Sequence, residues 1–142
     1  MISGFKSFRN GFTLIEILIA VVLLGLAMAA IVASNIAFTQ ATTHAAQLST
    51  AEFLIEQIRE RTALLSYGEL YNLNGTFNPP QDSNGRELTN FSDYSQVVEV
   101  KNVSDSDFQQ ADASSNFIRV TVRILYDNTV MDMNTSWIRS AD

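Results

Sequence analysis

The chain has 142 residues, no cysteine and a formal net charge of −6, and 46% of its residues are hydrophobic. This length allows one domain with an extension, and the lack of cysteine excludes a fold held together by disulfides. Beyond Lys6 and Arg9 the sequence has no cluster of basic residues, which argues against binding nucleic acid through a basic face.

The N-terminal segment combines a basic start with a long apolar run. Residues 1–11 contain Lys6 and Arg9 and no acidic residue, and every residue from 14 to 33 except Glu16 is apolar or Gly. Twenty residues of helix span about 30 Å, which is the thickness of the hydrocarbon core of a membrane. Basic residues beside such a run hold that end in the cytoplasm. The segment is therefore predicted to be a membrane helix or the hydrophobic part of an export signal.

Glu16 helps to choose between these readings. An ordinary signal peptidase would cut after the small residues Ala27-Met28-Ala29 and release a soluble protein. A carboxylate inside a membrane segment costs roughly 2.5–3.5 kcal/mol and is usually retained for a function. Glu16 is thus an unusual residue for a discarded signal, unless it lies close enough to the interface to stay hydrated. An uncut protein with a single membrane span is a third interpretation.

The sequence Gly11-Phe12-Thr13-Leu14-Ile15-Glu16 lies after a short basic leader and before an apolar helix. It resembles the N-terminus of the type IV prepilins, which include pilus subunits and the pseudopilins of type II secretion. The resemblance implies that prepilin peptidase removes residues 1–11 by cutting between Gly11 and Phe12 and methylates the new amino group of Phe12. Residues 12–33 would be kept as a transmembrane and assembly helix.

The same resemblance implies partners and a location. The partners are prepilin peptidase, an inner-membrane assembly platform and other pilin or pseudopilin subunits, which bind through the N-terminal helix. The precursor would cross the inner membrane once with its N-terminus in the cytoplasm. The processed subunit would enter a filament in the periplasm or at the cell surface.

Two positions in the helix carry further expectations. Glu16 is implied to pair with the amine of Phe12 on a neighbouring subunit, since a buried charge is tolerable only when it is paired. This pair would set the register between subunits. Gly25 is a candidate point of helix flexibility, or else a site of close helix packing. The family often has a proline eight residues later, where this chain has Ala33.

Residues 34–66 continue as an amphipathic helix. Apolar or small residues recur at three- and four-residue steps: Ala41, Ala45, Leu48, Ala51, Ile55, Ile58, Thr62 and Leu65. One helix is therefore predicted from about Phe12 to about Ser66. Within the family, residues 51–60 resemble the PilV-like minor pilins and the I-type minor pseudopilins, and the absence of a C-terminal disulfide also favours the minor class. His44 is the only histidine, so a zinc site is not expected.

Residues 67–95 are rich in turn-forming residues and are predicted to be a long surface loop, with room for a short strand or helical turn. Within it, Asp82–Glu87 has a weak similarity to a calcium loop. Its spacing does not fit the EF-hand pattern, and Arg86 adds a competing charge. No metal or cofactor is therefore expected.

A small antiparallel sheet is predicted over residues 96–138, with strands at 96–103, 116–126 and 129–138. The second strand has the clearest alternation, with Ile118, Val120, Val122, Ile124 and Tyr126 on one face. Asp127-Asn128 favours a two-residue hairpin turn between the last two strands. Trp137 is expected to pack in the sheet or the core.

Together these elements predict an α+β, pilin-like fold. One long N-terminal α-helix packs on the small antiparallel sheet, and residues 34–142 form the periplasmic or extracellular domain. No nucleophile–base pair or phosphate loop is present in the sequence, so the chain is not expected to be an enzyme. The predicted function is a structural minor subunit of a type IV pilus or type II secretion pseudopilus, in a priming or tip complex. The residues are compatible with priming, adhesion, DNA uptake or secretion. The alternative is a soluble exported binding module released by cleavage after Ala29.

Overall fold

The computed structural model describes residues 12–141. The chain divides into two compact units, one ending at His44 and the other beginning at Ala45. Helix α1 (Leu14–Leu64) contributes to both, and each part is described with its own unit. The predicted leader 1–11, including Gly11, lies outside the described residues.

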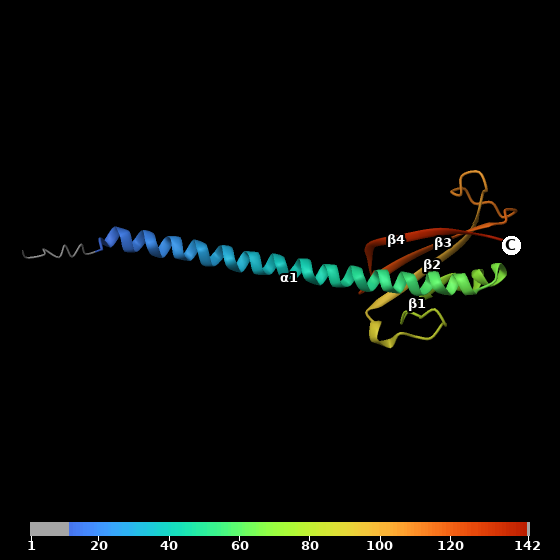
Figure 1. Cartoon of the computed structure of the whole chain (residues 1–142), viewed down its shortest axis with the longest axis horizontal. Coiled ribbons are helices and arrows are strands. Elements are labelled where there is room, and N and C mark those ends of the chain that lie inside the picture. The colour runs from blue at the N-terminus through green and yellow to red at the C-terminus, as the bar shows by residue number, and fades with distance from the viewer. Residues whose placement is uncertain (1–11, 142) are drawn as a thin grey trace, which may run out of the picture. The chain divides into compact units, whose positions relative to one another are not determined.

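In the first unit, α1 is an uninterrupted helix whose side chains are exposed from Leu14 to His44 (blue to blue-green in Figure 1). The helix passes through Gly25 and Ala33 without a break. Its ends, Leu14 and Leu64, lie within two residues of the predicted ends, Phe12 and Ser66. A long helix was predictable because neither proline nor a turn-forming cluster interrupts the segment.

The second unit contains a four-stranded antiparallel sheet in the order β1-β2-β3-β4 (Figure 1). The strands are β1 (Gly75–Phe77), β2 (Tyr94–Val103), β3 (Phe117–Tyr126) and β4 (Thr129–Ser140). Three of these strands were predicted with their bounds, and β1 is a short strand inside the predicted loop 67–95, where a short strand was allowed but not placed. A three-residue strand is too short to show a period-two pattern. Strand β2 also begins slightly earlier than residue 96, because Tyr94 and Ser95 pair with Tyr126 and Leu125.

The β3–β4 hairpin confirms the turn predicted at Asp127-Asn128. Tyr126 pairs with Thr129, and Asp127 and Asn128 have φ of 47° and 59°. Two positive φ values are typical of a type I′ turn, whose twist matches that of the flanking strands. The predicted core face of β3 is also confirmed, since Ile118, Val120, Val122 and Ile124 are fully buried.

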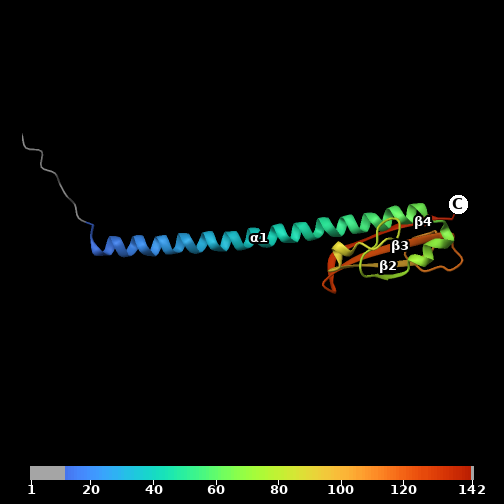
Figure 2. The same ribbon diagram turned by 90° about the horizontal axis from the view of Figure 1, so that it is seen from below.

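The core of the second unit lies between the sheet and the part of α1 after Ala45 (Figure 2). The helix contributes Ala51, Leu54, Ile55, Ile58 and Thr62 as buried residues. Four of these were in the predicted stripe, while Leu54 was not. Ala41 and Ala45, which were in that stripe, are exposed.

Polar contacts tie the same part of α1 to two strands. Trp137 of β4 donates its indole N–H to Oγ1 of Thr62 over 3.2 Å, and the guanidinium of Arg59 lies 5.7 Å from the centre of the indole ring. From β2, the side-chain amide of Gln96 donates to the backbone carbonyl of Leu54 over 2.9 Å. Trp137 therefore packs between the sheet and the helix, as predicted.

The predicted loop is an ordered part of the second unit. It contains the 3₁₀ helices η1 (Tyr67–Leu73) and η2 (Thr89–Phe91). Residues 81–83 are anchored by side chains of α1 and β2. The backbone N–H of Gln81 donates to Gln96 Oε1 over 2.7 Å, Arg61 donates to Gln81 Oε1 over 2.6 Å, and the N–H of Ser83 donates to Gln57 Oε1 over 3.1 Å. These contacts place the loop against the helix and strand β2.

Candidate functional site

The candidate site is the start of α1, where Thr13 caps the helix. The backbone carbonyl of Thr13 accepts from the N–H groups of Glu16 at 3.1 Å and Ile17 at 3.3 Å. Its hydroxyl also accepts from the N–H of Glu16 at 3.3 Å. A threonine followed three residues later by glutamate is the sequence signature of a helix N-terminus. Thr13 has no role in the sequence interpretation above, although this spacing identifies it as the cap.

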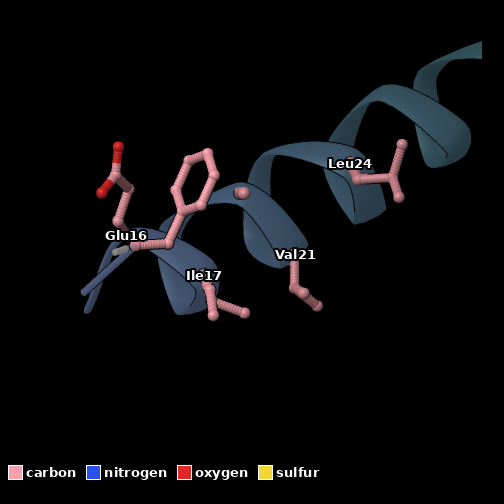
Figure 3. Close-up of a pocket in the computed structure, with 6 residues that line it drawn as sticks. Glu16, Ile17, Val21 and Leu24 are labelled. Atoms are coloured by element: carbon pink, nitrogen blue, oxygen red, sulfur yellow. The ribbon is translucent and has the colours of Figure 1, made fainter. Parts of the chain in front are cut away.

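Glu16 lies in the first turn of α1. A negative side chain near the positive end of the helix dipole stabilises a helix by about 0.3–1 kcal/mol. Figure 3 shows its carboxylate pointing away from the helix, on the side opposite Ile17 and Val21. Within residues 12–141 the carboxylate has no hydrogen bond or ion pair. It is therefore available to a group from outside this unit.

The surface beside Glu16 is apolar. Phe12, Glu16, Ile17, Ala20, Val21 and Leu24 line a shallow depression of about 340 Å³ (Figure 3). Phe12, the predicted first residue after cleavage, precedes the helix and is 78% exposed. At this depression the helix therefore presents one acidic group among apolar side chains.

The exposed apolar surface extends along the whole N-terminal part of α1. Its large side chains are each between 53% and 80% exposed: Phe12, Leu14, Ile15, Ile17, Leu18, Ile19, Val21, Val22, Leu23, Leu24, Leu26, Met28, Ile31, Val32, Ile36 and Phe38. Among the described helices, α1 alone is long and apolar enough to cross a membrane. A helix that is apolar on all sides must be covered by lipid or by other helices.

Gly25 lies in the middle of this apolar part and apart from Glu16. Nine residues of helix separate them, about 13 Å along the axis. A Cβ atom added at Gly25 would have nothing within 4 Å. Within its own unit, the glycine is therefore not required by a close contact, and its suggested role in flexibility or packing stays a prediction.

The oxygens of Asp82, in the segment with a weak similarity to a calcium loop, already have protein partners. Its carboxylate accepts from the N–H groups of Asn84 at 2.9 Å and Arg86 at 2.8 Å, and from Nε of Arg86 at 2.9 Å. These hydrogen bonds, led by the backbone N–H of Arg86, lower the pKa of Asp82. Within residues 12–141 no group of three His, Cys, Asp or Glu residues could hold a metal ion.

The acidic connection between β2 and β3 also uses its carboxylates locally. Asp107 accepts from the N–H groups of Gln109 at 2.9 Å and Gln110 at 3.2 Å. Asp112 accepts from the hydroxyl of Ser114 at 2.6 Å. These bonds lower the pKa values of both aspartates. Both carboxylates thus stabilise turns of the loop in which they lie.

Comparison with known proteins identifies the N-terminal segment. Residues 6–32 match the protein family described as "Prokaryotic N-terminal methylation motif". No curated protein and no solved structure matches the chain. The matched residues include Thr13, Glu16 and most of the exposed apolar surface, and the fold is one long N-terminal helix packed on a four-stranded antiparallel sheet. This motif and this apolar helix support a type IV prepilin-like protein.

Proposed function

We propose that this protein is a minor structural subunit of a type IV pilus or a type II secretion pseudopilus, acting in a priming or tip complex. The observation that carries the proposal is the exposed apolar part of α1, most of which lies within the methylation motif at residues 6–32 and which bears a single carboxylate. Pilins are structural proteins, and the motif is that of prepilin peptidase substrates. The lack of cysteine and the resemblance of residues 51–60 to minor subunits support the minor class.

Processing would change the charge at the start of the helix. Cleavage between Gly11 and Phe12 would remove Lys6 and Arg9 and create a positive amine on Phe12. That amine would be two residues before Leu14, at the positive end of the helix dipole, where a positive charge is unfavourable. A carboxylate from another subunit would offset both the charge of the amine and the positive end of the helix dipole.

Glu16 has the properties needed to supply that carboxylate. It is exposed and points away from its own helix (Figure 3). When apolar helices pack together, the Phe12 amine of one subunit and the Glu16 carboxylate of the next would be desolvated together. A buried ion pair adds little stability, but the loss of either partner is costly. The pair would therefore fix the register between subunits.

The experiment that tests the processing step is intact mass spectrometry with N-terminal sequencing of the mature protein. The comparison is between cells with and without prepilin peptidase. We expect a chain beginning at methylated Phe12 only when the peptidase is present. Gly11→Val should block this cut, and Ala29→Leu should leave it unchanged.

Two other results would contradict the proposal. A chain beginning at Ala30, lost in Ala29→Leu and kept in Gly11→Val, would indicate a soluble protein released by signal peptidase. A chain that keeps Met1 in both strains would indicate a permanent single-span anchor.

A further inference from the structure

The face of the sheet that does not pack against α1 carries a group of charged side chains, mostly positive. Successive residues of a strand point to opposite faces. Because Val120 of β3 is buried in the core between sheet and helix (Figure 2), Arg119 and Arg123 point to the other face. On β2, Lys101 lies directly opposite Arg119, and Glu99 shares the face with it. We call Glu99, Lys101, Arg119 and Arg123 the basic face.

The positive charge of the basic face is only partly compensated within the protein. Like charges in directly opposite positions, such as Lys101 and Arg119, destabilise a sheet. Glu99 forms an ion pair with Lys101 over 2.5 Å. Arg119 donates to the backbone carbonyl of Phe108 over 3.1 Å, a neutral acceptor that leaves its charge in place. Arg123 is exposed and makes no hydrogen bond or ion pair within residues 12–141. One carboxylate therefore serves three cations.

The outer side of α1 in the same unit has the opposite charge. Glu52, Glu56 and Glu60 are exposed and follow one another at four-residue steps, a spacing at which like charges repel. We call these three residues the acidic stripe. Glu60 comes nine residues after the buried Ala51, half a turn away around the helix, so this end of the stripe faces away from the sheet. Glu56 forms an ion pair with Arg59 over 3.6 Å, whereas Glu52 and Glu60 form none within residues 12–141.

The basic face and the acidic stripe match in sign and in length. Arg119 and Arg123 are four residues apart on a strand, which is about 13 Å. Glu52 and Glu60 are eight residues apart on a helix, which is about 12 Å. The two unpaired carboxylates can therefore lie over the two arginines at the same time. Because the two surfaces lie on opposite sides of one unit, they can meet only between molecules.

We propose that the basic face binds the acidic stripe of a second copy of this chain. The contact joins two different surfaces, so it is heterologous and leaves one surface of each kind free for a further copy. Complementary charges of this sort favour one partner and one orientation over others. This inference rests on the proposed function, and it adds that at least two copies of the subunit lie next to each other in the complex.

The test is cysteine cross-linking between two differently tagged copies of the full-length protein, which the cysteine-free chain allows. One copy carries Ser136→Cys on β4, an exposed position opposite Thr121 in the middle of the basic face. The other carries Ala63→Cys, an exposed position on α1 three residues after Glu60. Both copies are produced in filament-forming cells and treated with a bismaleimide. We expect an adduct that carries both tags.

Charge reversal separates this contact from proximity without binding. Arg123→Glu on the copy with the β4 cysteine, or Glu60→Arg on the copy with the α1 cysteine, would place like charges together. Each reversal should reduce the doubly tagged adduct by about fivefold or more. The two reversals together exchange the charges and should restore most of the adduct. Glu87→Arg, a reversal at an exposed acidic residue outside the stripe, is the control and should leave the adduct unchanged.

Two results would overturn this contact and leave the proposed function standing. One is the absence of a doubly tagged adduct with the native charges, and the other is an adduct that charge reversal does not reduce. Both apply when immunoblots show the protein in sheared filaments. Absence of the protein from sheared filaments, together with absence of the adduct, would overturn the proposed function as well.

Discussion

Two polar residues, Gln96 and Glu16, differ in their burial and in their hydrogen bonding. Gln96 is completely buried. Its side chain accepts from the N–H of Gln81 and donates to the carbonyls of Leu54 and Gln81. Glu16 is exposed and has no partner within residues 12–141. Because buried polar groups require hydrogen bonds, Gln96 acts inside the second unit, whereas the pairing of Glu16 with a neighbouring subunit is a proposal.

Replacing Gln96 should destabilise the second unit. Gln96→Leu would leave the half-buried N–H of Gln81 without an acceptor, at a cost of about 1–3 kcal/mol. Urea unfolding of the full chain in detergent, followed by the fluorescence of Trp137, measures this loss. As a control, Gln110→Leu changes an exposed loop residue and should alter the free energy of unfolding by less than about 0.5 kcal/mol. Equal stabilities of the two variants would contradict a structural role for Gln96.

Replacing Glu16 should affect assembly and leave the second unit folded. In Glu16→Gln, the Phe12 amine of a neighbour would be buried without its counter-charge. We therefore expect incorporation into sheared filaments to fall by roughly tenfold or more. Immunoblots of filament and membrane fractions measure it. Glu87→Gln, a matched change at an exposed site of the second unit, should incorporate normally. Normal incorporation of Glu16→Gln would show that the carboxylate has no role in assembly.

At the scale of elements, tight turns hold the long connection between α1 and β2 in place. In the turn at residues 82–86, the N–H of Asp82 donates to the carbonyl of Arg86 and the N–H of Gly85 to that of Asp82, both over 2.9 Å. Gly85 has φ +80°, a conformation that residues with a Cβ atom rarely adopt. The guanidinium of Arg61 lies over Gly85, so this turn requires a residue that has no Cβ atom.

Gly85→Ala should destabilise the protein by about 1–2 kcal/mol. The added Cβ would lie 2.9 Å from Nη2 of Arg61, and the positive φ would become strained. Gly68→Ala is the matched control, since a Cβ there meets nothing within 4 Å and no positive φ is involved. Thermal unfolding followed by circular dichroism compares the two. A Gly85→Ala variant as stable as Gly68→Ala would argue against strain in this turn.

The same turn should weaken in acid. Hydrogen bonds from Arg86 and Asn84 lower the pKa of Asp82 in the folded protein. A carboxylate with a lowered folded pKa contributes stability above its unfolded pKa, near 3.9. This contribution is lost as the pH falls through the folded pKa. The stability difference between the native protein and Asp82→Asn should therefore shrink below about pH 4. Urea unfolding across this pH range measures it, and a constant difference would contradict the assignment.

At the scale of the whole molecule, apolar side chains are divided between two kinds of surface. In the second unit they form a core that begins at Ala51 and continues to Ile124. In the first unit they are exposed along α1, where no described residue covers them. The second unit can thus satisfy its own hydrophobic surface, whereas the first needs lipid or other helices.

A chain beginning at Ser34 should therefore be soluble and folded. Since every buried core residue lies after this point, its melting temperature should match that of the full chain in detergent. Circular dichroism and size-exclusion chromatography measure both properties. A large loss of stability or aggregation would show that the second unit depends on the apolar helix.

The sequence predicted most of the fold because its patterns are long. The helix and three of the four strands follow from periodicity over eight or more residues, and the hairpin turn follows from the turn-forming pair Asp127-Asn128. Strand β1 is too short to show a period. The burial of Leu54 was not predictable from the stripe, because the width of a buried helix face depends on what packs against it.

What the sequence by itself determined is the prepilin-like N-terminus. The motif around Gly11 and Phe12, the carboxylate of Glu16 and the apolar run are local, so they can be recognised without a structure. Only the tertiary structure decided that Gln96 joins the loop, β2 and α1 and that Asp82 bonds to its own turn. These properties depend on which segments meet in space. Hydrogen bonds between residues distant in the chain leave no period or spacing in the sequence.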